Sequence, residues 1–129
     1  MNFTFTKEER LCSRKDIEAL ILRGHASFLY PFKIHWILTS DQNEPIKIAF
    51  AVPKKRFKRA NQRNLIKRRM RESYRLQKPF LIAKLGTLNL QVHLLLVYSA
   101  SQVMDYHELD CNIKKMVDVL WSDIQKLVK

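Results

Sequence analysis

Residues 54–78 read KKRFKRANQRNLIKRRMRESYRLQK and carry most of the charge of the chain. They hold 12 of its 24 Lys and Arg residues but only one of its 12 acidic residues, Glu72. The stretch therefore has a net charge of +11, out of +12 for the whole 129-residue chain. The sequence outside it is nearly neutral. Basic charge confined to one stretch is typical of a surface that binds a nucleic acid.

The second half of this stretch predicts a helix. No helix breaker occurs in residues 62–77, and Pro79 follows. At the angular step of an α-helix, the apolar side chains of Ile66, Met70 and Tyr74 form one stripe, which we expect to pack on a sheet. The polar side chains fall in another arc of about 140°. That arc contains Arg63, Asn64, Lys67, Arg68, Arg71 and Arg75.

The cations of this arc predict a phosphate-binding surface. Like charges four residues apart, such as Lys67 and Arg71, repel each other, and a bound phosphate reverses that cost. A helix face that is merely solvated normally mixes both signs. Arg guanidinium groups and Asn amides also bind phosphates and bases. The predicted surface contains Lys54, Lys55, Lys58, Arg59, Arg63, Asn64, Lys67, Arg68, Arg71 and Arg75.

The flanking sequence predicts strands and two further helices. Alternating apolar residues indicate strands over 32–39 and 46–52, which we expect to pair antiparallel through the turn at 41–45. An aliphatic run indicates a central strand over 90–98, and a short strand around 26–30 is possible. Helical periodicity indicates a first helix over 13–23, ending at Gly24, and a last helix from Ile113 to the C-terminus.

This order predicts an α+β fold in one domain spanning residues 1–129. The elements would follow the order αβββαβα, with a four-stranded, mainly antiparallel sheet packed by helices. The longest apolar runs, such as 94–98, are far shorter than the roughly 20 residues of a membrane span. With no apolar signal-peptide core in residues 1–16 and only two widely spaced cysteines, we expect a cytoplasmic protein without a membrane partner.

The sequence contains no predicted reaction centre. Its four histidines lack the spacing of metal ligands, and no cysteine lies near them in sequence to complete a zinc site. Asp105, Glu108 and Asp110 precede or begin the last helix, where carboxylates suit the helix dipole. We therefore expect no catalytic residue and no bound metal in the protein itself.

Residues 63–75 resemble the signature of the bacterial ribonuclease P protein component, roughly Arg-Asn-Arg-x-Lys-Arg-x-x-Arg-Glu-x-Phe-Arg. Two fixed positions differ, because Leu65 replaces an arginine and Tyr74 replaces a phenylalanine. Leu65 lies away from the basic arc, so we expect little loss of affinity, and Arg69 is a candidate to take its place. The likeness also covers Lys54, Lys55, Phe5, Lys7, Arg10, Leu11, Asp16, Ile17 and Gly24.

The resemblance implies an α-β sandwich in which the signature helix forms a left-handed βαβ crossover. It implies a subunit of ribonuclease P, which removes the 5′ leader of precursor tRNA. The basic helix would bind the catalytic RNA, with one protein per RNA, and that RNA would hold the catalytic Mg²⁺. A ribosomal or other structural RNA-binding protein remains the alternative.

The resemblance further implies a cleft between the first helix and the sheet that holds the leader. The sheet face opposite the large apolar residues carries Lys33, His35 and small side chains, which leaves room for nucleotides and a ring to stack on a base. The first helix supplies Ile17 and Ile21, where the family commonly has phenylalanines. We assign the leader to Ile17, Ile21, Lys33 and His35, although helix or solvent covering this face is an equal alternative.

Overall fold

The computed structural model describes residues 7–40 and 44–128, so Phe5 and residues 41–43 of the predicted turn lie outside it. The predicted αβββαβα order is confirmed, including the short strand before residue 30. The elements are η1 (Lys7–Glu9), α1 (Arg14–Arg23), β1 (His25–Leu29), β2 (Phe32–Thr39), β3 (Ile46–Ala51), α2 (Ala60–Thr87), β4 (Gln91–Tyr98) and α3 (Tyr106–Val128).

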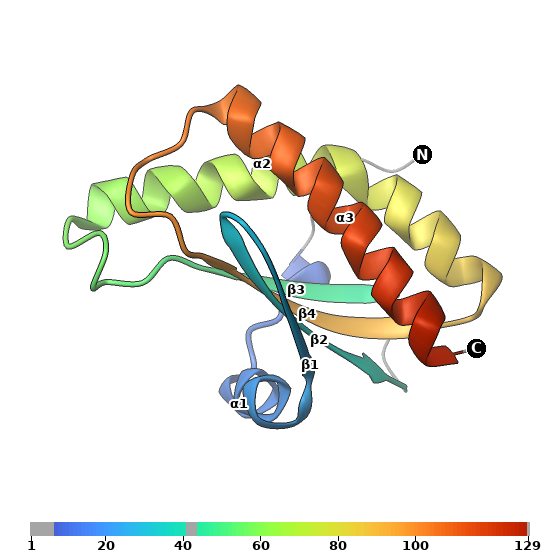
Figure 1. Ribbon diagram of the computed structural model, residues 1–129. Helices are drawn as coiled ribbons and strands as arrows, with labels where there is room; N and C mark the ends of the chain where they lie inside the picture. Colours follow the sequence, from blue (N-terminus) through green and yellow to red (C-terminus); the bar gives the residue numbers. More distant parts are fainter. Residues whose placement is uncertain (1–6, 41–43, 129) are drawn as a thin grey trace.

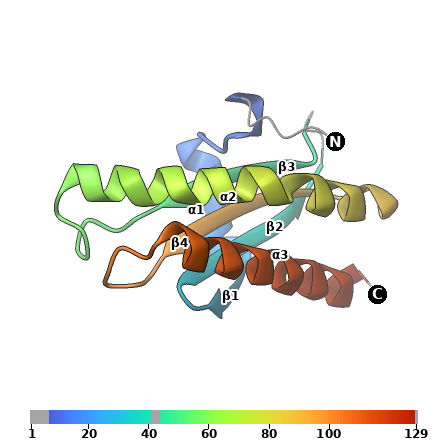
Figure 2. The same cartoon turned by 90° about the horizontal axis from the view of Figure 1, so that it is seen from above.

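The sheet separates α1 from the two longer helices. Figure 1 shows α2 and α3 over one face and α1 beneath the other, and Figure 2 shows α2 and α3 lying side by side above the strands. The main core fills the space under α2 and α3, where Ile66, Met70 and Tyr74 are buried as the helical periodicity predicts. A smaller apolar cluster around Leu20 and Leu95 lies under α1. The α-β sandwich is therefore confirmed.

The strand order is β1-β2-β4-β3, and the predicted pairing of β2 with β3 is wrong. β4 lies between them, antiparallel to β2 and parallel to β3, and α2 is the crossover that joins the parallel pair. The reason is burial on both faces: Leu94 and Leu96 belong to the core under α2 and α3, whereas Leu95 lies under α1. A strand that is apolar on both faces is most stable at the centre of the sheet.

Helix α2 runs ten residues beyond its predicted end, so the prediction that it stops before Pro79 is also wrong. A proline inside a helix costs about 3 kcal/mol. The extension fully buries Leu81 and Leu85, each with a burial free energy of roughly 1.5–3 kcal/mol, which offsets that cost. None of the helices in the described ranges is long and apolar enough to cross a membrane.

Both ends of α1 follow from the local sequence. Ser13 is the N-cap, and its Oγ accepts a hydrogen bond from the Asp16 backbone N–H at 3.3 Å. Gly24 is the C-cap, and its Cα lies close to the last turn of α1 and to β2. A Cβ at this position would clash with the Leu20 carbonyl oxygen and lie 3.0 Å from that of Trp36. This close approach places α1 directly against β2.

Candidate nucleic-acid interface

The loop before α2 is anchored by one buried ring. Phe57 is buried and contacts the ring of Tyr98, with 5.9 Å between the ring centroids. Its backbone N–H donates to the Pro53 carbonyl, which closes the turn. Only the Phe57 ring of this loop is held in the core, so the neighbouring cations all remain exposed. These exposed cations are Lys54, Lys55, Arg56, Lys58 and Arg59.

Arg63 supports this loop. Its Nη1 donates to the carbonyl oxygens of Phe57 at 2.7 Å and of Lys58 at 3.0 Å. Part of its hydrogen-bonding capacity is therefore used within the protein, a structural role that the helical projection did not predict. The contact holds the loop cations beside the first turn of α2.

The remaining members of the predicted arc differ in how their charge is used. Asn64, Arg68 and Arg71 are exposed, and Lys67 is half-buried. Arg75 instead forms an ion pair with Glu72, with 2.7 Å between Nη2 and Oε1. The hydrogen bond from Arg75 lowers the pKa of Glu72, so this carboxylate stays ionised and partly neutralises Arg75.

Arg69, the candidate to replace the arginine missing at position 65, makes a hydrogen bond within the protein. Its Nη1 donates to the Met104 carbonyl at 2.7 Å, which ties α2 to the segment before α3. Leu65 is half-buried. Arg69 thus ties two elements together, and its compensation for Leu65 stays a prediction.

A third chain segment adds a cation that the sequence analysis did not assign to this surface. Arg10 pairs with Ile48 as an isolated bridge at the edge of β3, and the Leu11 N–H donates to the Ile48 carbonyl at 2.9 Å. There Arg10 joins Lys67 and Arg71 around a cavity of about 190 Å³, which we call the cation pocket. The only sequence signal for Arg10 was its position in the N-terminal pattern of the resemblance.

A buried ion pair holds the segment that carries Arg10. Lys78 Nζ lies 2.7 Å from Glu9 Oε2, and the two side chains are only 2% and 8% exposed. Tyr74 lies close by, and its burial, followed by the charge of Glu9, raises the pKa of its hydroxyl. This pair links η1 to the middle of α2 and so positions the cation pocket.

The predicted leader residues do not form one uniform cleft. Ile17 belongs to the apolar cluster under α1, whereas Ile21 on the same helix is 52% exposed. Lys33 is exposed and His35 is half-buried on the sheet face that α1 covers in part. Part of this face therefore lies under α1 and part is open, and the assignment of the leader to these residues stays a prediction.

The open part contains an aromatic residue that the sequence analysis missed. Phe28 pairs in register with Lys33, so both side chains lie on the α1 face of the sheet, and Phe28 is 60% exposed. The same row continues through Val97 and Ala51. An exposed ring, a cation and small neighbours along one row form a platform on which a single-stranded nucleotide can stack.

His35 contributes a neutral ring to this face. Burial, followed by the charge of Lys33, lowers the pKa of its imidazole. Its Nδ1 is buried and has no hydrogen-bond partner among the described residues. The ring is therefore uncharged at neutral pH, which suits stacking or hydrogen bonding rather than phosphate neutralisation.

Within residues 7–40 and 44–128, no three His, Cys, Asp or Glu side chains gather as a metal-binding group. The carboxylates before and in α3 have structural partners: the Asp105 carboxylate accepts from the Glu108 N–H at 2.9 Å, and Asp110 accepts from the Ser73 hydroxyl at 2.6 Å. These contacts give the two carboxylates a structural role at the start of α3.

The sequence of this chain matches a protein family and named relatives. A family model described as Ribonuclease P matches residues 5–121. A protein of Porphyromonas gingivalis named "Ribonuclease P protein component" is 30% identical over 114 residues, covering 88% of this chain and 83% of the relative. The same values hold for the protein of a second strain.

Solved structures share the fold at lower identity. The RNase P protein of Staphylococcus aureus superposes with a TM-score of 0.71 at 16% identity, over 87% of this chain and 94% of the other. The RNase P protein of Thermotoga maritima gives a TM-score of 0.66 at 18% identity, over 84% and 94% of the two chains. At these identities the likeness concerns the arrangement of helices and strands.

Proposed function

This chain belongs to the ribonuclease P protein family, and from that premise we propose that it binds two RNAs on adjoining surfaces. It is a subunit of ribonuclease P, the endoribonuclease of tRNA 5′ processing, and it therefore has an RNA partner. The observation that carries the proposal is the convergence of cations from two chain segments, Arg10 from the N-terminal segment and Lys67 and Arg71 from α2, at the cation pocket beside the α1 face of the sheet.

The first proposed surface takes the catalytic RNA subunit. It combines the loop cations with the exposed arc of α2, where Arg68 and Arg71 have the planar guanidinium groups that suit phosphates. Arg63 acts here chiefly by holding the loop, and Arg75 contributes less because Glu72 offsets its charge. The proposed contacts are Lys54, Lys55, Lys58, Arg59, Arg63, Asn64, Lys67, Arg68, Arg71 and Arg75.

The second proposed surface takes the 5′ leader of precursor tRNA along the open row of the α1 face. Phe28 and His35 offer rings, Lys33 offers a cation, and Ile21 offers an exposed apolar side chain from α1. Ile17 supports this surface because its side chain packs in the apolar cluster between α1 and the sheet. Leader contacts of this kind favour precursor over mature tRNA, which lacks the leader.

We assign the hydrolytic chemistry, and the Mg²⁺ that supports it, to the RNA subunit in the cytoplasm. The protein's contribution would be electrostatic: cations between two RNAs reduce phosphate repulsion, so that less Mg²⁺ is needed for the complex to form.

The test is reconstitution with the RNA subunit from the same organism. We expect the purified protein alone to leave precursor tRNA intact, and the protein with the RNA to cleave it at lower Mg²⁺ than the RNA alone. The measurement is the initial cleavage rate across a Mg²⁺ titration at several salt concentrations. Absence of stimulation at every salt concentration, or recovery of ribosomal RNA rather than ribonuclease P RNA with the protein from cells, would contradict the proposal.

The leader surface is tested by Phe28→Ala. We expect the preference of the reconstituted enzyme for precursor over mature tRNA to fall about tenfold, because a stacked base contributes roughly 1–3 kcal/mol. The measurement is the ratio of the two dissociation constants. Phe80→Ala is the matched control, because Phe80 is an exposed phenylalanine on α2, and we expect it to leave the ratio unchanged. Equal effects of the two variants would show that the α1 face does not bind the leader.

A further inference from the structure

A second cavity lies on the opposite side of the sheet from α1. It has a volume of about 500 Å³ and opens between edge strand β1, its neighbour β2 and the last turns of α3. His25 and Ser27 pair in register with Trp36 and Ile34 of the main core, which places this cavity on the α3 face. Its size falls within the range of ligand sites, roughly 300–1,000 Å³. The RNA surfaces proposed above do not include it.

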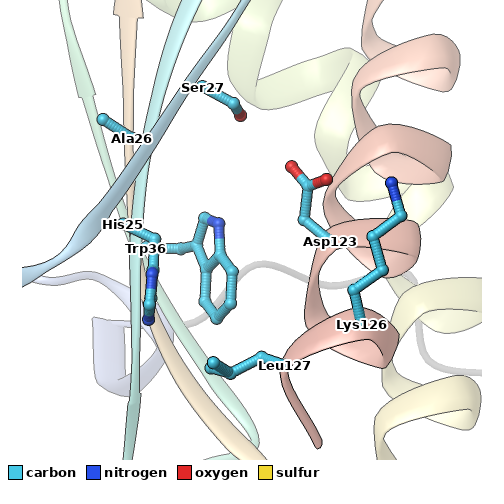
Figure 3. Close-up of a pocket in the computed structure, with 7 residues that line it drawn as sticks. All are labelled: His25, Ala26, Ser27, Trp36, Asp123, Lys126 and Leu127. Atoms are coloured by element: carbon cyan, nitrogen blue, oxygen red, sulfur yellow. The ribbon is translucent and has the colours of Figure 1, made fainter. Parts of the chain in front are cut away.

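Three polar residues line this cavity without partners in the described part of the chain. The Ser27 hydroxyl is buried with no hydrogen bond. The Asp123 carboxylate and the Lys126 ammonium group make no hydrogen bond or ion pair with any described residue. Figure 3 shows the Ser27 and Asp123 side chains directed into the same space, with Lys126 beside it. Only the Ser27 hydroxyl is buried, whereas Asp123 is half-buried and Lys126 is exposed. Because a buried hydroxyl normally has a partner, Ser27 indicates room for a polar ligand beside these two charged groups.

The rest of the lining combines the stacked rings of Trp36 and His25 with the aliphatic side chain of Leu127. Trp36 is 3% exposed and stacks on His25, with 4.4 Å between the ring centroids. Figure 3 shows the Trp36 ring between the strands and α3, with Leu127 below it. A planar ring that enters between these walls would be held by apolar contact, while its edge would meet the polar groups.

The polar groups select which planar ring fits. A carboxylate accepts two parallel N–H donors, which guanine presents at N1 and N2. Adenine presents one N–H beside an acceptor nitrogen, which a carboxylate repels. A simple cation would meet Asp123 but also the like charge of Lys126, three residues further along the same helix face. The Lys126 ammonium instead suits a phosphate.

We propose that this cavity binds a guanosine 5′-phosphate group, with Asp123 accepting from the base edge, Ser27 hydrogen-bonding the ligand and Lys126 meeting the phosphate. The group is either a free guanine nucleotide or an unpaired guanosine of an RNA.

The test uses Trp36 as the reporter, because the chain has only two tryptophans and Trp121→Phe leaves Trp36 alone. Titrations of this variant with GMP, AMP and spermidine follow the change in fluorescence. We expect GMP to bind at least about tenfold more tightly than AMP, and Asp123→Asn to remove at least about tenfold of the GMP affinity. The matched control is Asp118→Asn, an exposed carboxylate on the same helix outside the cavity, which we expect to leave GMP binding unchanged.

A second arm separates the two sources of the ligand. Two short single-stranded RNAs that differ only in one G or A are compared on the protein and on its Asp123→Asn variant. Discrimination of G over A that disappears in the variant supports a guanosine taken from RNA, whereas discrimination among mononucleotides alone supports a free nucleotide. Equal binding of GMP and AMP, tighter binding of spermidine, no binding of any probe, or equal losses in the Asp118 and Asp123 variants would overturn the proposal.

Discussion

Replacing Lys67 and Arg71 together with alanine is expected to weaken binding to ribonuclease P RNA about 20-fold near 0.15 M salt. Both side chains line the cation pocket. Each phosphate contact contributes a salt-dependent slope of about 0.7 to 0.9 in log affinity against log salt, which at this salt corresponds to roughly a fivefold gain per contact. The two substitutions should therefore also lower the slope by about 1.4 to 1.8. The measurement is RNA affinity across a salt series.

The matched control is Lys114→Ala with Lys115→Ala on α3. Both lysines are exposed, and the change in net charge is the same. We expect the slope of this control to stay that of the original protein, because the outer face of α3 lies outside the proposed surface. Similar slopes for the two double variants would show that the total charge, rather than the face of α2, determines affinity. Circular dichroism of each variant checks that the fold is retained.

The second large effect is expected from Lys78→Met, which should lower the free energy of unfolding by about 3–5 kcal/mol. The substitution removes the ammonium group that pairs with the buried Glu9 carboxylate, and such a loss is far more costly than removing both partners. The measurement is urea unfolding, with the midpoint and the m-value compared. We expect the double variant Glu9→Leu with Lys78→Met to recover most of the lost stability, because its apolar side chains can pack together.

The control for this prediction is Lys84→Met in the same helix. Lys84 is 41% exposed and lies 4.0 Å from Asp118, so its loss should change stability by no more than about 0.5 kcal/mol. If Lys78→Met proved as mild as Lys84→Met, the pair would not hold η1 to α2. In the folded protein, loss of this pair should also displace Arg10 from the cation pocket and weaken RNA binding.

The two errors in the predicted fold have one physical cause, which is packing between distant segments. The turn before β3 suggested a hairpin with β2, yet the burial of Leu94, Leu95 and Leu96 on two faces brings β4 between them. Pro79 suggested a helix end, yet the buried side chains beyond it favour continuation. Local signals describe each segment by itself, whereas these outcomes depend on what the segment packs against.

The sequence by itself determined the element order, the apolar stripe of α2 and the concentration of basic charge in residues 54–78, because these follow from residue type and the periodicity of a helix. Only the tertiary structure decided how that charge is used. It directs Arg63 and Arg69 to backbone carbonyls, and it brings Arg10 from the N-terminal segment to α2 through a buried ion pair. Side-chain direction and long-range contact are set by packing, which no local pattern contains.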